Sequence, residues 1–166
     1  MLPVSQIISH TPTWVFVVFF ALLTLGFMQS KQRKVRVKTI FILPLAMVLF
    51  SLFGVYSVFG LSLVTLALWV LGLVLALMLG LKLAYPKVVS YSLKNNKLTI
   101  PGSWTPLALM MAIFFTKYFM GFAVARSLPI INDMVFIALI CMLYGVFSGT
   151  FLARCLVMFK ASKSSE

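Results

Sequence analysis

One lysine lies in the middle of a long apolar stretch. It is Lys117, at the centre of MAIFFTKYFMGFA, residues 111–123. If this stretch crosses a membrane, the ammonium group costs roughly 2.5 to 3.5 kcal/mol on insertion scales, so such a residue usually faces a helix bundle or a wet cavity. Three roles are open for it: a structural or snorkelling lysine, a residue in the path of an anionic solute, or a contact with a partner protein.

Catalytic groups are scarce in the chain, which contains only two acids and one histidine. Asp133 and Glu166 lie far apart in the sequence, and His10 lies near the N-terminus. No Ser-His-Asp set, carboxylate pair, metal cluster or phosphate-binding loop can be assembled from these residues. We therefore expect a protein that is not an enzyme, with no catalytic residues, no metal site and no cofactor.

The composition indicates a membrane protein. Hydrophobic residues make up 63% of the 166 residues and charged residues 10%, which is more apolar surface than one soluble core can bury. Because a helical span takes about 20 residues, the length allows about five or six crossings. The net charge of +12 does not indicate nucleic-acid binding, because the cations fall between apolar runs rather than on one amphipathic face.

Five apolar runs are predicted to be transmembrane helices, so the fold class is an all-α polytopic membrane protein. Thr-Pro pairs precede the first and fourth runs, as is typical of a helix start. Asn132 or Asp133 can cap the fifth run, and we expect Pro44 to kink the second near its start. Residues 1–166 form a single membrane domain with spans at about 12–28, 39–59, 62–83, 105–125 and 133–157.

A β-hairpin is predicted over residues 87–101, between the third and fourth helices. Apolar and polar residues alternate on both sides of Asn95 and Asn96, and an Asn-Asn pair tolerates a two-residue hairpin turn. Pairing Tyr91 with Ile100 would place the apolar residues on one face. We expect this face to lie on the end of the helix bundle or at the lipid interface, because a lone hairpin is marginal in water.

The charges between the spans predict the orientation of the chain. Cytoplasmic loops carry an excess of lysine and arginine. We therefore expect the N-terminus and the loop with Arg126 outside, and the hairpin and the C-terminus in the cytoplasm. Of the fourteen lysines and arginines, twelve fall on the second side: Lys31, Arg33, Lys34, Arg36, Lys38, Lys82, Lys87, Lys94, Lys97, Arg154, Lys160 and Lys163.

The surroundings of Lys117 suggest how the spans pack. It lies about 18 Å along its helix from Thr105, past the midplane. Gly121 and Ala125 follow on the same face, and the fifth span offers small residues at helical spacing between Ala138 and Gly149. Since small residues let two helices approach closely, we expect Lys117 to point into the bundle beside this stripe, and toward the outer half of the membrane.

Two further groups of charged residues are candidate sites. Arg126 and Asp133 lie at the outer ends of the fourth and fifth spans and are a candidate ion pair, although Lys117 could also reach toward Asp133. The basic segment after the first span is a candidate for binding anionic lipid headgroups, at about 1 kcal/mol per cation near the surface. Its cations are Lys31, Arg33, Lys34, Arg36 and Lys38.

The chain resembles a family of small bacterial inner-membrane proteins of unknown function. The resemblance extends over most of the chain and rests on the segments TPTW, QSKQRKVR, LPLAMVLFSLFGVYSVFG and IPGSWTPLALMMAIFFTKYFMGF. It implies a fold of about five spans in the bacterial inner membrane. It also makes Lys117 and the four residues Pro101, Gly102, Ser103 and Trp104 candidate signature positions.

Two functions remain open from the sequence. The first is a small integral membrane module that acts through the bilayer, anionic lipid headgroups or a membrane protein partner, with no nucleic acid involved. The second is a transporter or channel component for a small anionic solute, in which Lys117 lines the path. Five spans show no internal repeat, so a pore of this kind would require a homo-oligomer.

Overall fold

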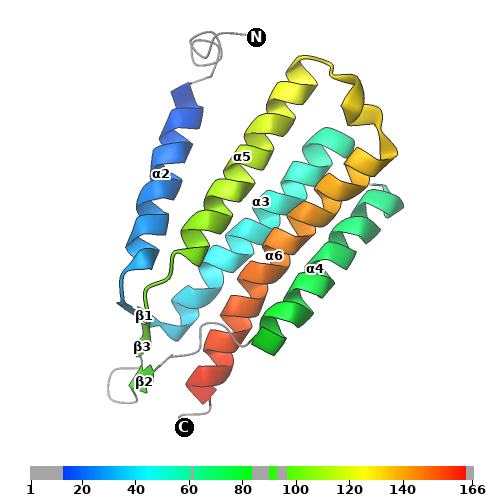
Figure 1. The fold of residues 1–166 in the computed structure, drawn as a ribbon. Helices are drawn as coiled ribbons and strands as arrows, with labels where there is room; N and C mark the ends of the chain where they lie inside the picture. Colours follow the sequence, from blue (N-terminus) through cyan, green and yellow to red (C-terminus); the bar gives the residue numbers. More distant parts are fainter. Residues whose placement is uncertain (1–12, 61, 84–89, 93–96, 164–166) are drawn as a thin grey trace.

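In the part of the chain that the structure describes, five α-helices stand side by side with a small β-sheet at one end (Figure 1). The computed structural model describes residues 13–60, 62–83, 90–92 and 97–163. Within these residues the helices are α2 (Thr13–Ser30), α3 (Ile42–Phe59), α4 (Leu63–Leu83), α5 (Thr105–Ala125) and α6 (Met134–Lys163). Two short 3₁₀ helices, η1 (Val37–Phe41) and η3 (Pro129–Asn132), lead into α3 and α6.

Four helical segments are long and apolar enough to cross a membrane: Thr39–Phe59, Leu63–Leu83, Thr105–Ala125 and Met134–Ala161. The apolar part of α2, Val15–Ser30, is shorter. Many large apolar side chains are exposed on the outside of the bundle, Leu45, Leu79 and Leu139 among them. Exposed apolar side chains of this kind suit contact with lipid, and the architecture is that of a multi-pass membrane protein.

The helix bounds differ from the sequence prediction at two places. The last helix continues to Lys163 instead of ending near residue 157. The second run is divided, because η1 covers Val37–Phe41 and α3 begins only at Ile42. Pro44 therefore lies in the first turn of α3, a position that proline tolerates, and the kink stays a prediction.

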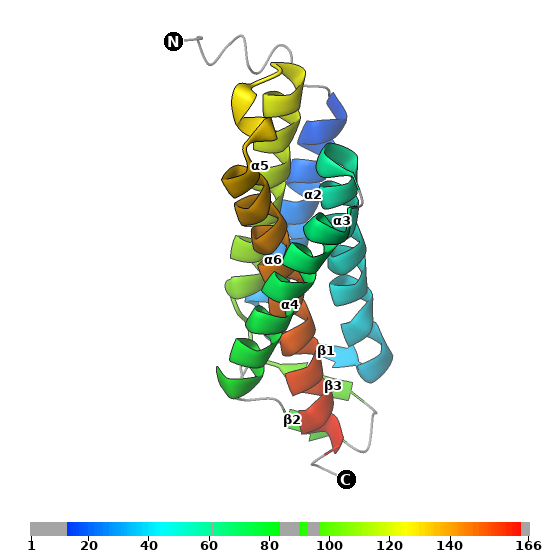
Figure 2. The ribbon, with the colours of Figure 1, turned by 90° about the vertical axis from the view of Figure 1, so that its right-hand side faces the viewer.

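The centre of the structure is the contact between α6 and α4, seen in Figure 2 with α4 in front of α6. Gly145 and Gly149 of α6 lie against the backbone of α4, and Gly72 of α4 lies against the backbone of α6. A Cβ atom at Gly145 would overlap the carbonyl oxygen of Trp69. The small residues of α6 thus permit a close approach, as predicted, but the partner helix is α4.

The predicted partner of this stripe, α5, packs mainly against α2 instead. The rings of Phe19 and Phe114 pack at a tilt of 49° with their centroids 5.3 Å apart, and Gly26 lies against Leu107. Gly121, which was expected to face α6, has no atom within 4 Å of the position that a Cβ would take. The predicted contact between α5 and α6 was wrong because the glycines of α6 show that a helix can approach closely there but do not specify which helix it is.

A buried hydrogen-bond network joins α3 to the α4–α6 pair. The Ser51 hydroxyl of α3 donates to the main-chain carbonyl of Tyr144 in α6 at 2.9 Å and accepts from Trp69 Nε1 of α4 at 2.9 Å. Ser148 donates to the same carbonyl at 3.2 Å. Both serines are fully buried, so each polar group has a partner where water is absent.

The sheet has three strands, in the order β1–β3–β2: β1 (Arg33–Arg36), β3 (Lys97–Ile100) and β2 (Ser90–Ser92). The predicted hairpin corresponds to β2 and β3, but Tyr91 pairs with Leu98 rather than with Ile100. This register pairs Ser92 with Lys97, so the connection comprises residues 93–96, and the predicted Asn-Asn turn lies outside the described residues. The third strand, β1, was not predicted, because RKVR is too short to identify without its partner.

The glycines allow a direct test of the central helix contact. We expect Gly145→Ala to lower the free energy of unfolding by about 1 to 3 kcal/mol, because the added methyl group overlaps the α4 backbone. Gly121→Ala is the matched control: its methyl group meets no atom, and alanine favours a helix by up to about 1 kcal/mol over glycine. Equilibrium unfolding in mixed micelles measures both variants. Equal effects of the two substitutions would contradict the packing described here.

Candidate functional site

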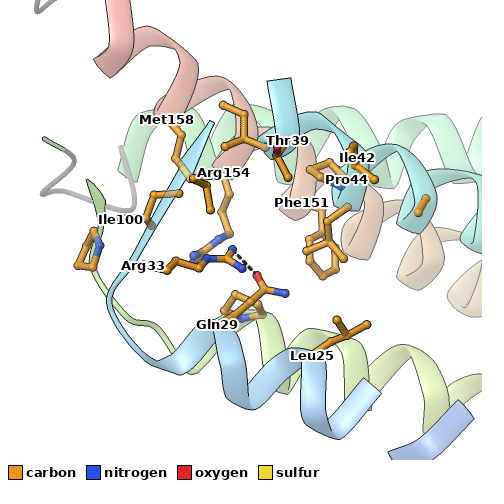
Figure 3. Close-up of a pocket in the computed structure, with 16 residues that line it drawn as sticks. Leu25, Gln29, Arg33, Thr39, Ile42, Pro44, Ile100, Phe151, Arg154 and Met158 are labelled. Atoms are coloured by element: carbon orange, nitrogen blue, oxygen red, sulfur yellow. Dashed lines mark hydrogen bonds between the residues drawn. The ribbon is translucent and has the colours of Figure 1, made fainter. Parts of the chain in front are cut away.

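A pocket of about 330 Å³ opens at the sheet end of the bundle (Figure 3). It lies between the end of α2, the strands β1 and β3, the start of α3 and the last turns of α6. Most of its wall is apolar, with Leu25, Leu43, Phe151 and Met158 among the lining residues. None of the residues that line it is acidic.

Two arginines line this pocket, and Figure 3 shows their guanidinium groups directed into the same part of it. Arg33 comes from β1 and is half-buried, whereas Arg154 comes from α6 and is only 8% exposed. Arg33 Nη2 donates to Gln29 Oε1 at 3.0 Å, and Arg154 Nη1 lies 3.5 Å from Ser103 Oγ. Burial lowers the pKa of Arg33 from its ordinary value, but a guanidinium stays charged in proteins. The pocket therefore combines two positive charges with an apolar wall.

The residues 101–104 that the resemblance singled out fix one side of this pocket. The Ser103 amide donates to the Gln29 carbonyl at 3.0 Å, and the Ser103 hydroxyl accepts from the Thr105 amide at 3.2 Å in the first turn of α5. Gly102 lies directly against the Ser30 carbonyl, where a Cβ has no room. These contacts hold the start of α5 against the end of α2, and Pro101 itself lines the pocket.

The predicted basic cluster is only partly a pocket element. Arg33 enters the pocket, but Lys34 and Arg36 are exposed, as the alternation along β1 requires. Lys31 is also exposed, with its amine 5.3 Å from the Phe27 ring centroid. Lys38 follows in η1, and its side chain lies outside the described part of the structure.

Two of the pocket's polar residues, Gln29 and Arg154, were not predicted as site residues from the sequence. Arg154 was counted only as a cytoplasmic charge, yet it lies inside the apolar run of α6, as Lys117 lies inside that of α5. A cation within an apolar helix was the available signal for it. Gln29 gave a weaker signal, because it lies at the end of a run where polar residues are expected.

Lys117 lies away from this pocket, between α5 and α3. Its Nζ is 3.8 Å from the ring centroid of Phe50 and 5.2 Å from that of Phe53. The side chain passes over Gly54, where its Cε would be 2.9 Å from a Cβ. Lys117 thus contacts α3 rather than the small-residue stripe of α6. Two cation–π contacts contribute about 0.5 to 2 kcal/mol each, which is comparable with the insertion cost of the lysine.

Arg126 and Asp133 do not form the predicted ion pair. Asp133 Oδ1 instead accepts a hydrogen bond from the Phe136 amide at 2.9 Å, which caps the start of α6 as predicted. The Arg126 guanidinium lies 5.8 Å from the ring centroid of Phe122 on its own helix. The cap satisfies a free helix N–H, so the carboxylate has a local partner and needs no cation.

Comparison with known proteins gives one match. A family model described as "Family of unknown function (DUF6622)" matches residues 2–165. No curated protein and no solved structure matches the chain.

The position of Lys117 predicts the effect of removing its charge. We expect Lys117→Met to leave the free energy of unfolding unchanged or to raise it by up to about 2 kcal/mol, because the saved insertion cost equals or exceeds the lost cation–π contacts. Lys82→Met, at the exposed end of α4, is the control and should change stability by no more than about 0.5 kcal/mol. Unfolding in mixed micelles measures both. A loss well above 1 kcal/mol in Lys117→Met alone would contradict this balance.

Proposed function

Because this chain belongs to a family of unknown function, DUF6622, we propose its function from its own residues: it is a membrane module that binds an anionic lipid through the pocket of Arg33 and Arg154. In this proposal the phosphate group lies between the two guanidinium groups, and the first carbons of the lipid lie along the apolar wall. The function is binding rather than catalysis.

The main support for this proposal is that the guanidinium groups of Arg33 and Arg154 point into the same part of the pocket. Arg33 and Arg154 line one pocket whose described wall offers no carboxylate. An anion between the two guanidinium groups would be attracted to both of them. The guanidinium group presents paired N–H donors that match the oxygens of a phosphate.

The apolar wall supports a lipid over a free phosphate. Leu25, Leu43, Phe151 and Met158 offer no hydrogen bond to a small ion, but they suit the glycerol and upper acyl carbons of a lipid. The exposed cations around the pocket add a longer-range attraction of about 1 kcal/mol each to an anionic surface. Lys34 and Arg36 belong to this outer group.

We further propose that the pocket end faces the cytoplasm of a bacterium and that α2 is the fifth span. α2 has 18 residues, at the lower end of the length that crosses a bilayer, and it lies along α5 (Figure 1). Most of the basic residues lie at the sheet end, and the connection from α5 to α6 lies at the opposite end. The excess of cations on the cytoplasmic side of membrane proteins supports this orientation.

The orientation is tested by labelling single cysteines in intact cells. We expect Asn132→Cys to react with an impermeant maleimide from outside and Lys34→Cys to react only after the inner membrane is opened. The two native cysteines are buried, so they should give little background. Labelling of Lys34→Cys from outside would reverse the proposed orientation.

Lipid binding is tested with vesicles or nanodiscs that contain phosphatidylglycerol, by native mass spectrometry of the retained lipid. We expect Arg33→Gln to weaken retention about tenfold or more, because it removes a charge-assisted hydrogen bond within the pocket. Lys34→Gln removes the same charge from the adjacent, exposed position and should weaken it about fivefold or less. Arg154→Gln should resemble Arg33→Gln.

Two outcomes would contradict the pocket. Equal losses in Arg33→Gln and Lys34→Gln would mean that only the surface charge attracts lipid. Retention of neutral phosphatidylcholine as strong as that of phosphatidylglycerol would mean that the arginines select no headgroup.

A further inference from the structure

We infer that Lys117 and Tyr144 form a second binding site, within the membrane-spanning part of the bundle, for one small monovalent anion such as chloride. The site lies between α3, α5 and α6, and it is independent of the lipid pocket. It rests on three observations: an ammonium group without an acid, a buried hydroxyl without a hydrogen bond, and a glycine over which both side chains meet.

The ammonium group of Lys117 has ring faces as its neighbours but no counter-charge. Its Nζ lies 3.8 Å from the Phe50 ring centroid, and no ion pair of Lys117 occurs among the described residues. A ring face attracts a cation through its quadrupole but leaves its net charge in place. Asp133, the acid in the described part of the chain, caps α6 instead.

The hydroxyl of Tyr144 is a buried donor in the same region. Tyr144 is 1% exposed, and its Oη forms no hydrogen bond with any described residue. Buried side-chain hydroxyls nearly always have a partner, so this one calls for an acceptor. The main-chain carbonyl of Tyr144 is already used by Ser51 and Ser148, which fixes this turn of α6 and with it the origin of the tyrosine side chain.

Gly54 brings the two groups together. The position that a Cβ would take at Gly54 lies 3.2 Å from Tyr144 Cζ and 3.5 Å from Lys117 Nζ. Both side chains therefore flank one point on α3. An ammonium group can only donate, and a phenol can donate to a stronger acceptor, so the shared partner is an acceptor. A water molecule would satisfy the hydroxyl, but only an anion also neutralises the lysine.

The face of α5 beside Lys117 is not covered by another helix at Gly121. Gly121 lies four residues further along α5, on the same face as Lys117. It is exposed, and no atom lies within 4 Å of its Cβ position. No side chain at this position fills the space beside Lys117 on the side toward Arg126.

The site is tested by the chloride dependence of thermal unfolding of the full chain in nanodiscs of neutral lipid. Chloride replaces gluconate at constant ionic strength, so screening stays equal. We expect the unfolding midpoint to rise with chloride and to saturate. Tyr144→Phe should weaken the apparent affinity about fivefold or more, since it loses one hydrogen bond. Lys117→Met should abolish the dependence.

The controls separate this site from others. Tyr56→Phe changes an exposed tyrosine of α3 and should leave the chloride response intact, as should Arg33→Gln in the lipid pocket. A response that Lys117→Met retains in full would overturn the inference, as would the absence of any response in the unchanged protein. Broadening of the chloride-35 NMR line, reversed by Lys117→Met, is the second measurement and does not depend on stability. An unbroadened line would also count against the site.

Discussion

The contact between the backbones of α4 and α6 is the interaction on which the rest of the structure depends. In lipid the hydrophobic effect does not drive one helix onto another, because acyl chains are as apolar as leucine. Close van der Waals contact must do so, and Gly72, Gly145 and Gly149 allow it. The network of Ser51 then attaches α3 to this pair through hydrogen bonds that have no competition from water.

This core also determines where the polar groups lie. Because α6 is held against α4 and α3, its last turns carry Arg154 to the end of the bundle, where β1 carries Arg33. Higher up the same helix, Tyr144 faces Gly54. α6 thus supplies Arg154 to the pocket and Tyr144 to the region around Gly54. Lys117 reaches this second region from α5, which packs mainly against α2.

The sequence was sufficient for the helices but not for their neighbours. Hydropathy and the Thr-Pro starts located each apolar helix, with the largest error at the end of α6, because backbone groups in lipid have no partner outside their own helix. Pairing is different: Gly121 and Gly145 look alike in the sequence, yet only one meets another helix. The strand β1 was also beyond reach, since four residues acquire their strand geometry only from pairing with β3. For the candidate sites, Arg33 was predicted from its basic segment and Lys117 from its place within an apolar run. The roles of Gln29, Gly54 and Tyr144 depend on contacts between segments that are distant in the sequence, so the sequence does not indicate them.

The two arginines of the pocket come from opposite ends of the chain, and this has a consequence for biogenesis. A ribosome releases Arg33 before α3, α4 and α5 are made, and Arg154 only after them. Until α6 is inserted and seated on α4, the pocket has one cation and an incomplete wall. In the proposed function, headgroup binding would therefore distinguish a correctly assembled molecule from one in which α6 is not yet seated.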